Sequence, residues 1–257
     1  MCGILGFVHR APWQRPPLSE QALSRLAHRG PDGTGVYTDS HIQFGHTRLS
    51  IIDLTNAGHQ PMLSHNNRYV VTYNGEIYNY LELRAELEAL GESFTSHSDT
   101  EVLLAAYHVW GAACAQRFRG MFAFALWDTQ TKTAFLARDR CGEKPLFYQH
   151  TEQGLIFASE LKALVPLLAE RPSLNVEAID MYLHYQYVPE PNTLLSGVHK
   201  LAAGHTMTVS LEDWRATPVP NWCVETAAEP EPQANDASQF LPRIRTALED
   251  AVKLTLR

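Results

Sequence analysis

The sequence predicts an α+β fold for roughly its first 210 residues. Segments with the composition of β-strands are numerous, and they do not alternate regularly with helices as they would in a doubly wound parallel sheet. Some of them follow one another directly, joined by short turns such as TQTK at 129–132. A chain of 257 residues, 45% hydrophobic and 19% charged, is also long enough to bury a core without disulfides or metals.

The first part of the chain alternates apolar segments with one glycine-rich loop. We expect a helix at 19–28 (SEQALSRLAH), and strands at ILGFV (4–8), IQFGHTRLSII (42–52) and RYVVTYNG (68–75). HRGPDGTG at 28–35 has three glycines and a proline in eight residues, so it is predicted to be a structured loop without a regular element.

Two helices follow, at 79–91 and 98–111. In the first, leucines lie on one face, Asn79 can cap the start and Gly91 can end the helix. In the second, Ser98 and Glu101 have the spacing of a capping box.

The next segment is predicted to be a meander of four short strands. They are MFAFALWD (121–128), TAFLARD (133–139), LFYQH (146–150) and LIFASE (155–160). Helices are then expected at 160–168 and 176–185, and the segment 188–210 is read as a loop that ends in a strand.

The C-terminal part has a different composition. Residues 225–238 are acidic, rich in proline and alanine and without large apolar side chains, as in a linker. The last segment, 239–257, has apolar residues at helical spacing: Leu241, Ile244, Leu248 and Val252.

Composition and charge exclude several classes of protein. The formal net charge is −7, which gives no basic surface for nucleic acid or anionic lipid. No apolar run approaches the roughly 18–20 residues of a membrane span, and no basic segment precedes the apolar N-terminus as in a signal peptide. The four cysteines have no framework spacing, so we expect free thiols in a reducing cytoplasm.

The second residue is a cysteine, whose chemistry suits an N-terminal nucleophile. Methionine aminopeptidases remove Met1 when the next residue is small, which would leave Cys2 with a free α-amino group. Such an amine has a pKa of about 7.7–8.0, so it can accept a proton near neutral pH. One residue would then carry both the thiol and its base. Position 2 taken alone favours the other interpretation, a small buried apolar residue, because a lone cysteine is more often structural than reactive.

Three further segments hold side chains suited to the reaction of an amide with this cysteine. Asn74 offers a side-chain donor and Gly75 a backbone N–H, as an oxyanion hole requires, although the pair also fits an ordinary Asn-Gly turn. Arg48 can bind a carboxylate, or it can be an edge arginine that reaches solvent. Asp99 can bind an ammonium group, or it can simply complement a helix dipole.

Nine motifs occur in an order that resembles the glutaminase domain of glutamine-hydrolysing asparagine synthetases, which are class II glutamine amidotransferases. They are MCGILGF, HRGPDG, GHTRLSIIDL, QPM, YNGEIYNY, SDTEVLL, GMFAFALWD, ARDRCGEKPLFY and FASELKAL. The resemblance runs from Cys2 to about Lys200, with similar character almost to the linker, so we place this domain at 1–224.

The resemblance implies an N-terminal-nucleophile hydrolase fold, a four-layer αββα sandwich with two antiparallel sheets. It also implies hydrolysis of L-glutamine to glutamate and ammonia. Cys2 would form a glutamyl thioester, and Asn74 with Gly75 would form the oxyanion hole.

The same resemblance implies the substrate-binding residues. Arg48 would bind the α-carboxylate of glutamine, and Glu76 with Asp99 would bind its α-amino group. Backbone atoms of four consecutive residues would line the pocket: Leu49, Ser50, Ile51 and Ile52.

Two other motifs are expected to be structural. His28, Arg29, Asp32 and Gly33 belong to a motif near the active site, with a structural or gating role. DRCGEKPLFY at 139–148 is expected to hold the meander together. No metal site is expected, because the chain has neither HExxH nor CxxC.

Synthetases of this family also have an ATP-dependent domain with an SGGxDS loop, which these 257 residues lack. We interpret 239–257 as the first helix of such a synthetase domain, truncated or missing here, and expect a longer full-length gene product. ATP and Mg are expected only in that domain, and no cofactor in the glutaminase domain. The expected partners are L-glutamine and the synthetase domain, with a homodimer left open.

Several alternatives remain at this point. The glutaminase domains of glucosamine-phosphate synthase and of phosphoribosyl-pyrophosphate amidotransferase share the Cys2 chemistry, but HRGPDG and NGEIYNY favour the asparagine synthetase branch. The ammonia acceptor could also be a sugar or a peptide. A non-catalytic regulatory module would be expected to have a broken site, and a general cysteine amide hydrolase would not explain Arg48 and Asp99 as a pair.

Overall fold

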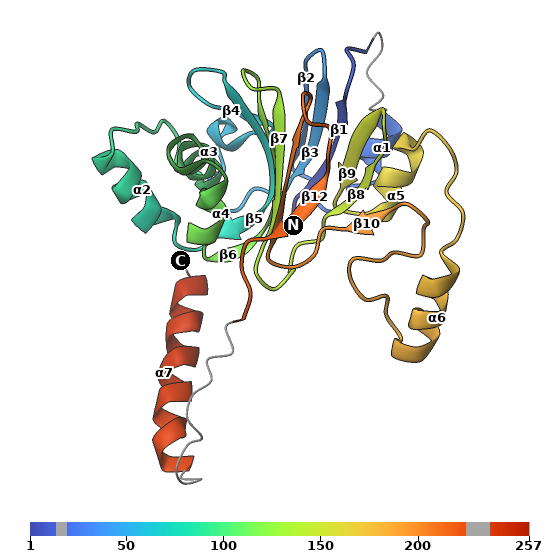
Figure 1. Ribbon diagram of the computed structural model, residues 1–257. Coiled ribbons are helices and arrows are strands. Elements are labelled where there is room, and N and C mark those ends of the chain that lie inside the picture. Colours follow the sequence, from blue (N-terminus) through green and yellow to red (C-terminus); the bar gives the residue numbers. More distant parts are fainter. Residues whose placement is uncertain (14–19, 225–236, 257) are drawn as a thin grey trace.

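The computed structural model describes residues 1–13, 20–224 and 237–256, with the backbone alone at 237–239. Its strands form two six-stranded sheets that lie face to face, and helices cover the two outer faces (Figure 1). Sheet A contains, in spatial order, β10 (His199–Lys200), β8 (Phe147–His150), β9 (Gly154–Ala158), β1 (Gly3–His9), β3 (Ile42–Arg48) and β2 (Gly33–Thr38). Sheet B contains β12 (Thr217–Pro220), β11 (His205–Ser210), β7 (Thr133–Arg138), β6 (Gly120–Asp128), β5 (Tyr69–Ile77) and β4 (Met62–Leu63).

The described helices range from 4 to 19 residues in length. They are α1 (Glu20–Ser24), α2 (Tyr80–Ala89), α3 (Asp99–Trp110), α4 (Cys114–Arg117), α5 (Leu161–Leu164), α6 (Val176–Tyr185) and α7 (Ala237–Thr255). Three 3₁₀ turns, at Asn56–Gly58, Gly111–Ala113 and Val165–Leu167, complete the described elements.

Three apolar layers separate these four layers of secondary structure. Strand β6 shows the arrangement, because its side chains alternate in direction. Phe122, Phe124 and Leu126 pack against α2, α3 and α4 on the outer face of sheet B. Ala123 and Trp127 face the other way, into the layer between the two sheets. A third apolar layer joins sheet A to α1 and α5.

The pairing within both sheets is antiparallel in every described ladder. The predicted αββα sandwich with two antiparallel sheets is therefore confirmed. Strand β1 lies in the middle of sheet A, between β3 and β9, and this position holds the N-terminus in place.

The predicted meander is wrong in one respect, because its four strands do not form one sheet. The hairpin of β6 and β7 belongs to sheet B, whereas the hairpin of β8 and β9 belongs to sheet A. The segment between them crosses from one sheet to the other. Local sequence shows each hairpin but carries no signal for which sheet receives it.

Several predicted boundaries also differ from the structure. β2 begins at Gly33, inside the segment predicted to be a loop, and β12 was not predicted. The predicted helix at 19–28 is helical only to Ser24. Beyond it, bonds such as Leu26 N–H to Leu23 O join residues three apart, so the chain continues as tight turns.

Both predicted helix caps need correction. Asn79 precedes α2, but its side chain binds the 117–119 segment: Nδ2 donates to Arg117 O, and Oδ1 accepts from Arg119 N–H. Ser98 does cap α3 by accepting from Thr100 N–H. The Glu101 carboxylate, however, accepts from Thr95 and Ser96, so the capping box is not closed.

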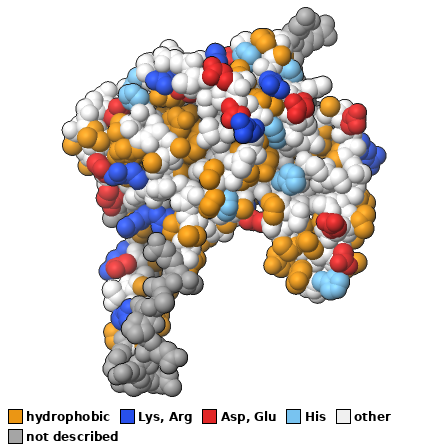
Figure 2. Space-filling model, viewed as in Figure 1, with side chains coloured by type: hydrophobic (Ala, Val, Ile, Leu, Met, Phe, Trp, Pro, Cys, Tyr) orange, Lys and Arg blue, Asp and Glu red, His pale blue; other side chains and the backbone are white. Residues whose placement is uncertain are grey.

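Two helices leave large apolar side chains exposed. On α6 these are Val176, Tyr182, Leu183 and Tyr185, in the lobe at the lower right of Figure 2. On α7 the predicted apolar stripe is exposed along its length. This helix begins at Ala237, two residues before the predicted start, and the rest of the predicted linker (225–236) lies outside the described residues. Within the described part of the chain, no helix meets the length and hydropathy needed to span a membrane.

Candidate active site

Cys2 lies immediately before β1, at one end of the space between the two sheets. Its carbonyl oxygen accepts a hydrogen bond of 2.9 Å from Arg29 Nε. Its Sγ is 3.4 Å from the backbone nitrogen of Leu49 and 3.6 Å from the carbonyl oxygen of the same residue. Cys2 is therefore held at its backbone by the 28–33 motif and at its thiol by Leu49, the residue that follows β3.

The thiol is also partly buried, and this affects its reactivity. Burial raises the pKa of Cys2, although the Leu49 N–H lowers it in part. A thiol with a raised pKa is almost fully protonated at neutral pH, so it needs a nearby base to act as a nucleophile.

Asn74 supplies a hydrogen-bond donor to the same pocket. Along β5 the side chains of Val70, Thr72 and Asn74 lie on one face, and Val70 packs into the layer between the sheets. Asn74 therefore projects toward sheet A, which carries Cys2. Its Nδ2 is buried and has no hydrogen-bond partner in the described part of the structure. Buried donors are almost always satisfied, so an unpaired one in a pocket points to a ligand.

Gly75 adds a backbone donor, as its pairing with β6 shows. Gly75 is opposite Phe122, whose N–H and C=O are both bonded to Asp139 on the far side of β6. The N–H of Gly75 therefore points away from β6, because alternate residues of an antiparallel strand face opposite neighbours. Two residues along in each direction, Tyr73 N–H donates to Gln60 Oε1 and Ile77 N–H donates to Asp99 Oδ2. Gly75 N–H lies between these two, at the pocket.

The close approach of β6 explains why a glycine is required here. A Cβ on Gly75 would lie 2.3 Å from Met121 O and 2.7 Å from Phe122 Cα, and both are backbone atoms that cannot move aside.

Two carboxylates form the acidic side of the pocket. Asp99, the first residue of α3, is 5% exposed, and its Oδ2 accepts from the Tyr73 hydroxyl at 2.7 Å. Burial raises the pKa of Asp99 to about 6 despite this bond, and burial also raises the pKa of Glu76. Both groups would therefore gain from a cation in the pocket, because an ammonium group restores the charge stabilisation that water gives.

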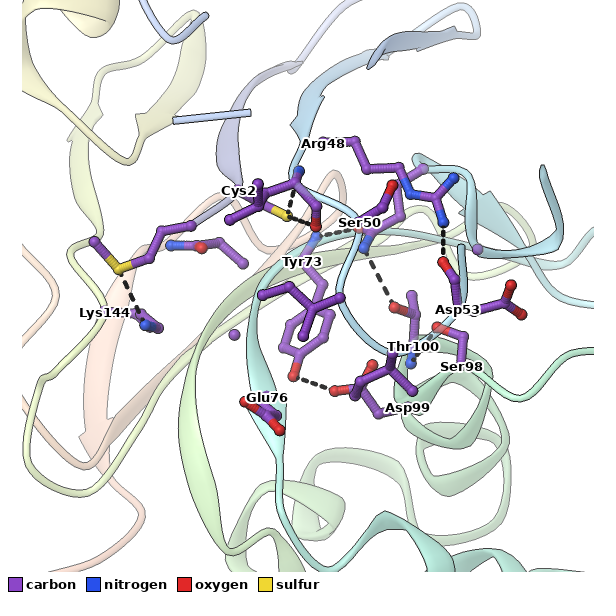
Figure 3. Close-up of a pocket in the computed structure, with 18 of the residues that line it drawn as sticks. Cys2, Arg48, Ser50, Asp53, Tyr73, Glu76, Ser98, Asp99, Thr100 and Lys144 are labelled. Atoms are coloured by element: carbon purple, nitrogen blue, oxygen red, sulfur yellow. Dashed lines mark hydrogen bonds between the residues drawn. The ribbon is translucent and has the colours of Figure 1, made fainter. Parts of the chain in front are cut away.

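Arg48 lies across the pocket at the end of β3. Its guanidinium donates to Thr55 O at 2.9 Å and to Asp53 O, so it braces the loop that follows β3. Gly58 allows this position, because a Cβ there would lie 2.6 Å from Arg48 Nη2. In Figure 3, Cys2 lies between Lys144 and Arg48, with Asp99 on the opposite side of the opening.

All ten predicted site residues line this one pocket, although they come from four separate parts of the chain. They are Cys2, Arg48, Leu49, Ser50, Ile51, Ile52, Asn74, Gly75, Glu76 and Asp99. The structure thus brings them together, while their individual roles remain proposals.

The 28–33 motif contacts the pocket residues without lining the pocket. Arg29 binds Cys2 and pairs with Glu160 at 2.9 Å, and Asp32 accepts from Ser50 N–H at 2.8 Å. His28 also binds Glu160. These contacts tie the terminus and the loop after β3 to sheet A, which is compatible with the structural role expected for the motif.

Within the described residues, no group of three or more His, Cys, Asp or Glu side chains is arranged to hold a metal ion. The four cysteines are all free thiols, and all four lie in the described part of the chain.

Comparison with known proteins shows the family to which this pocket belongs. The sequence profile of a family described as a glutamine amidotransferase domain matches residues 1–219. The chain belongs to the glutamine amidotransferase domain family.

Curated relatives of this amidotransferase domain are considerably longer. Glutamine-hydrolysing asparagine synthetase 1 of Bacillus subtilis (strain 168) is 37% identical over 262 residues. A putative glutamine-hydrolysing asparagine synthetase of Mycobacterium bovis is 39% identical over 277 residues. Both alignments cover 100% of this chain, but only 40% and 42% of the relatives. The chain therefore spans about two fifths of the length of these proteins.

A solved structure has the same fold as the amidotransferase domain. The phosphoribosylpyrophosphate amidotransferase of B. subtilis superposes with a TM-score of 0.60 at 20% identity, over 84% of this chain and 49% of that one. At this identity the similarity supports the two-sheet fold.

Sequence reasoning missed several residues of the amidotransferase pocket. Lys144, only 4% exposed, lies in a motif that we expected to be purely structural, yet its side chain lines the pocket beside Met1. Tyr73 and Gln60 are the first residues of the motifs YNGEIYNY and QPM, and neither was predicted to line the pocket. The one available signal was position, since Tyr73 directly precedes Asn74 and Gln60 belongs to the QPM motif.

Proposed function

We propose that this chain hydrolyses L-glutamine to glutamate and ammonia through a thioester at Cys2. The single observation that carries the proposal is the unpartnered, buried Asn74 Nδ2 in the pocket that also contains the Cys2 thiol. Because such a donor costs free energy unless a ligand fills it, it supports a site made for an oxyanion.

Removal of Met1 is the first step. Met1 lines the pocket, with its sulfur 3.1 Å from Lys144 Nζ, so its removal would both widen the pocket and free the amine of Cys2. This amine then accepts the thiol proton, which the raised pKa of Cys2 makes necessary.

The substrate is held at its amino-acid end. Arg48 binds the α-carboxylate, Glu76 and Asp99 bind the α-ammonium, and the backbone of 49–52 lines the space between. The opposite charges on the two sides of the pocket match a zwitterionic amino acid, and an arginine suits planar recognition of a carboxylate.

The reaction proceeds in two stages at the side-chain amide. The Cys2 thiolate attacks the amide carbon, and the resulting oxyanion accepts hydrogen bonds from Asn74 Nδ2 and Gly75 N–H. The protonated amine of Cys2 then gives its proton to the nitrogen, which leaves as ammonia. Water, deprotonated by the same amine, attacks the thioester, and the thiol leaves as glutamate forms.

The ammonia acceptor is the second part of the proposal. Because relatives more than twice as long are named asparagine synthetases, we propose that a synthetase domain of the same full-length protein uses the ammonia to make asparagine from aspartate. The exposed apolar stripe of α7 is compatible with a helix that belongs to that domain. A sugar or peptide acceptor is the alternative, and the complete set of pocket residues disfavours a regulatory module. Cytoplasmic location and a homodimer stay predictions.

Intact mass measurement with the glutamine analogue 6-diazo-5-oxo-norleucine tests the reaction. We expect loss of Met1 and a single adduct on the wild-type chain, and no adduct on Cys2→Ala. Cys223→Ala, which removes an exposed thiol outside the pocket, is the matched control and should react like the wild type. Retention of Met1, or a folded wild-type chain without an adduct, would contradict the proposal.

A further inference from the structure

We propose that His46 and Thr72 form a polar clip between the two sheets, which holds the oxyanion donors at a fixed distance from Cys2. The inference rests on the proposed glutamine hydrolysis. It gives these two residues a positioning role in that reaction, without contact to the substrate.

On sheet A, His46 lies next to the nucleophile. It belongs to β3 and is paired with Ile4 of β1, two residues from Cys2. Its side chain is on the same face of β3 as Ile42 and Phe44, which pack into the layer between the sheets. The imidazole is 0% exposed, so it lies within that layer.

On sheet B, the clip reaches the residues next to the oxyanion donor. His46 Nε2 is 3.2 Å from the carbonyl oxygen of Tyr73, which directly precedes Asn74. One residue earlier on each strand, the Thr72 hydroxyl donates to Gly45 O, also at 3.2 Å. The two bonds are adjacent, both are buried, and each joins β3 to β5.

The protonation of His46 makes its role as a donor definite. Burial lowers the pKa of His46 to about 3, so the imidazole is neutral near pH 7 and carries one N–H. A carbonyl oxygen can only accept, so this N–H is on Nε2. Nδ1 is then a bare acceptor, and it has no hydrogen-bond partner in the described residues.

The backbone N–H of Tyr73 is held as well as its carbonyl oxygen. Strand β4 pairs with β5 only as far as Val71, so the N–H and C=O of Tyr73 have no strand partner on the β4 side. Gln60 Oε1 accepts the Tyr73 N–H at 2.7 Å, and His46 binds the Tyr73 carbonyl. The side chains of Gln60 and His46 thus bind the backbone of Tyr73 where β4 no longer pairs with β5. Tyr73 directly precedes Asn74 and Gly75.

Close to the clip, the two sheets also meet through apolar side chains such as Ile4, Val70 and Ala123. Apolar burial is not directional, so it allows small sliding of one sheet over the other. A hydrogen bond weakens steeply with distance and angle. Catalysis is sensitive on this scale, since a displacement of about 1 Å can cost about 10²-fold in rate.

Steady-state kinetics of the processed chain with glutamine test the clip. We expect His46→Leu to lower kcat by roughly 10- to 100-fold and to raise KM by a smaller factor, because Arg48 and the loop after β3 do not depend on the clip, whereas Glu76 follows the oxyanion donors on β5. His46→Gln, whose amide restores an N–H donor, should recover most of the loss. Thr72→Val should lower kcat by about 3- to 10-fold, and Thr72→Ser should leave it unchanged.

Two measurements separate positioning from general loss of structure. Alkylation of Cys2 by iodoacetamide needs no oxyanion hole, so its rate should be the same in all four variants. Trp127→Phe is the matched control: it removes the bond from Trp127 Nε1 to Asp39 Oδ2, which joins the sheets at the other end of β6. It should lower the unfolding free energy but not kcat.

The kcat values of these variants, compared with that of the wild type, decide whether the clip positions the oxyanion donors. An unchanged kcat in folded His46→Leu, or a loss that appears equally in Trp127→Phe, would overturn the clip. If His46→Leu does not fold, Thr72→Val decides, since valine keeps the shape of threonine, and wild-type kcat there would overturn the clip. A wild-type chain that forms no Cys2 adduct would instead refute glutamine hydrolysis, and the clip's role with it.

Discussion

The two sides of the pocket are built very differently. On the strand side, Asn74 is 1% exposed and Asp99 is 5% exposed, and the backbone around them is held by buried side chains. On the loop side, the segment after β3 projects into solvent, with Ile51 63% exposed and Leu54 75% exposed. That loop is held by a few hydrogen bonds, among them those of Arg48 to Thr55 and Asp53 and that of Ser50 to Asp32.

This difference separates two tasks. Stabilising an oxyanion requires donors placed within a fraction of an ångström before the reaction begins, and buried strands provide that precision. Binding a substrate from solvent requires a side that can be approached, and an exposed loop provides it. Variants on the strand side should therefore change kcat or carry a stability effect, and variants at the loop tip should change little.

The largest effect is expected on the strand side, from Asn74→Ala. It removes one oxyanion donor, so kcat should fall by about 10²- to 10³-fold. The unfolding free energy should change by less than about 1 kcal/mol, because the lost amide had no partner for its Nδ2. Asn79→Ala is the matched control: it breaks two bonds to the 117–119 segment and should lower stability by about 1 kcal/mol with kcat unchanged.

Asp99→Asn, also on the strand side, should weaken glutamine binding and at the same time stabilise the fold at pH 7. Losing the charge should raise KM for glutamine by roughly 10-fold or more. The folded-state pKa of about 6 is above the ordinary value of 3.8, so ionised Asp99 opposes folding, and wild-type stability should fall as pH rises through 4 to 6. Asp99→Asn should remove that fall and be more stable than the wild type at pH 7, as measured by urea unfolding.

Asp128→Asn is the control for Asp99→Asn. Asp128 is also buried, but it lies outside the pocket and its pKa is shifted in the opposite direction. Burial alone would raise the pKa of Asp128, but hydrogen bonds from Arg68 lower it. Its stabilisation is present above the unfolded pKa and is lost as pH falls, so Asp128→Asn should destabilise the chain at pH 7 and leave KM unchanged. If Asp99→Asn behaved like Asp128→Asn, its assigned place in the pocket would be wrong.

The ionisation of Asp99 also predicts how glutamine binding depends on pH. Only the carboxylate form attracts the substrate ammonium, so KM should rise about tenfold per unit as pH falls below about 6. Kinetics between pH 5 and 8 test this, and a wild-type KM that is constant across the range would contradict it. The rise should be absent in Asp99→Asn.

A smaller effect is expected from Arg48→Lys, at the base of the loop. The planar guanidinium of arginine can donate to two backbone carbonyls and a carboxylate at once, whereas the single ammonium of a lysine cannot. KM should therefore rise by about 10-fold, with kcat changing less. Arg10→Lys, an exposed arginine that pairs with Glu152 on the surface, is the control and should behave like the wild type. A change in kcat alone would show that Arg48 acts on the oxyanion side.

The smallest effect is expected from Leu54→Ala at the loop tip. Because this side chain is largely in solvent, unfolding free energy should change by less than about 0.5 kcal/mol, and KM by less than about 3-fold. Leu26→Ala, a buried leucine that packs beneath sheet A, should cost about 2–5 kcal/mol in the same urea measurement. Equal losses in the two variants would show that the loop is packed more tightly than its exposure indicates.

Much of this pocket was predictable from sequence because its chemistry is concentrated in short motifs. Cys2 is recognisable from its position together with the motifs that follow it, and Asn74, Gly75 and Glu76 are consecutive. The apolar segment at β6 and the leucines of α2 likewise predicted their elements correctly. What failed were features that depend on partners outside the element itself. The capping roles of Asn79 and Glu101 are examples: Asn79 binds Arg117, which is 38 residues away, and Glu101 binds Thr95 in the loop before its own helix.

The sequence by itself determined the identity of the reactive groups, because thiol, amide and carboxylate chemistry belongs to single residues and to their order in the chain. Only the tertiary structure decided that two hairpins enter different sheets, that Lys144 lines the pocket, and that His46 meets Tyr73. Those contacts join residues 27 or more positions apart. They exist only when two sheets stack in one register, and that register is set by the whole apolar layer rather than by any short segment.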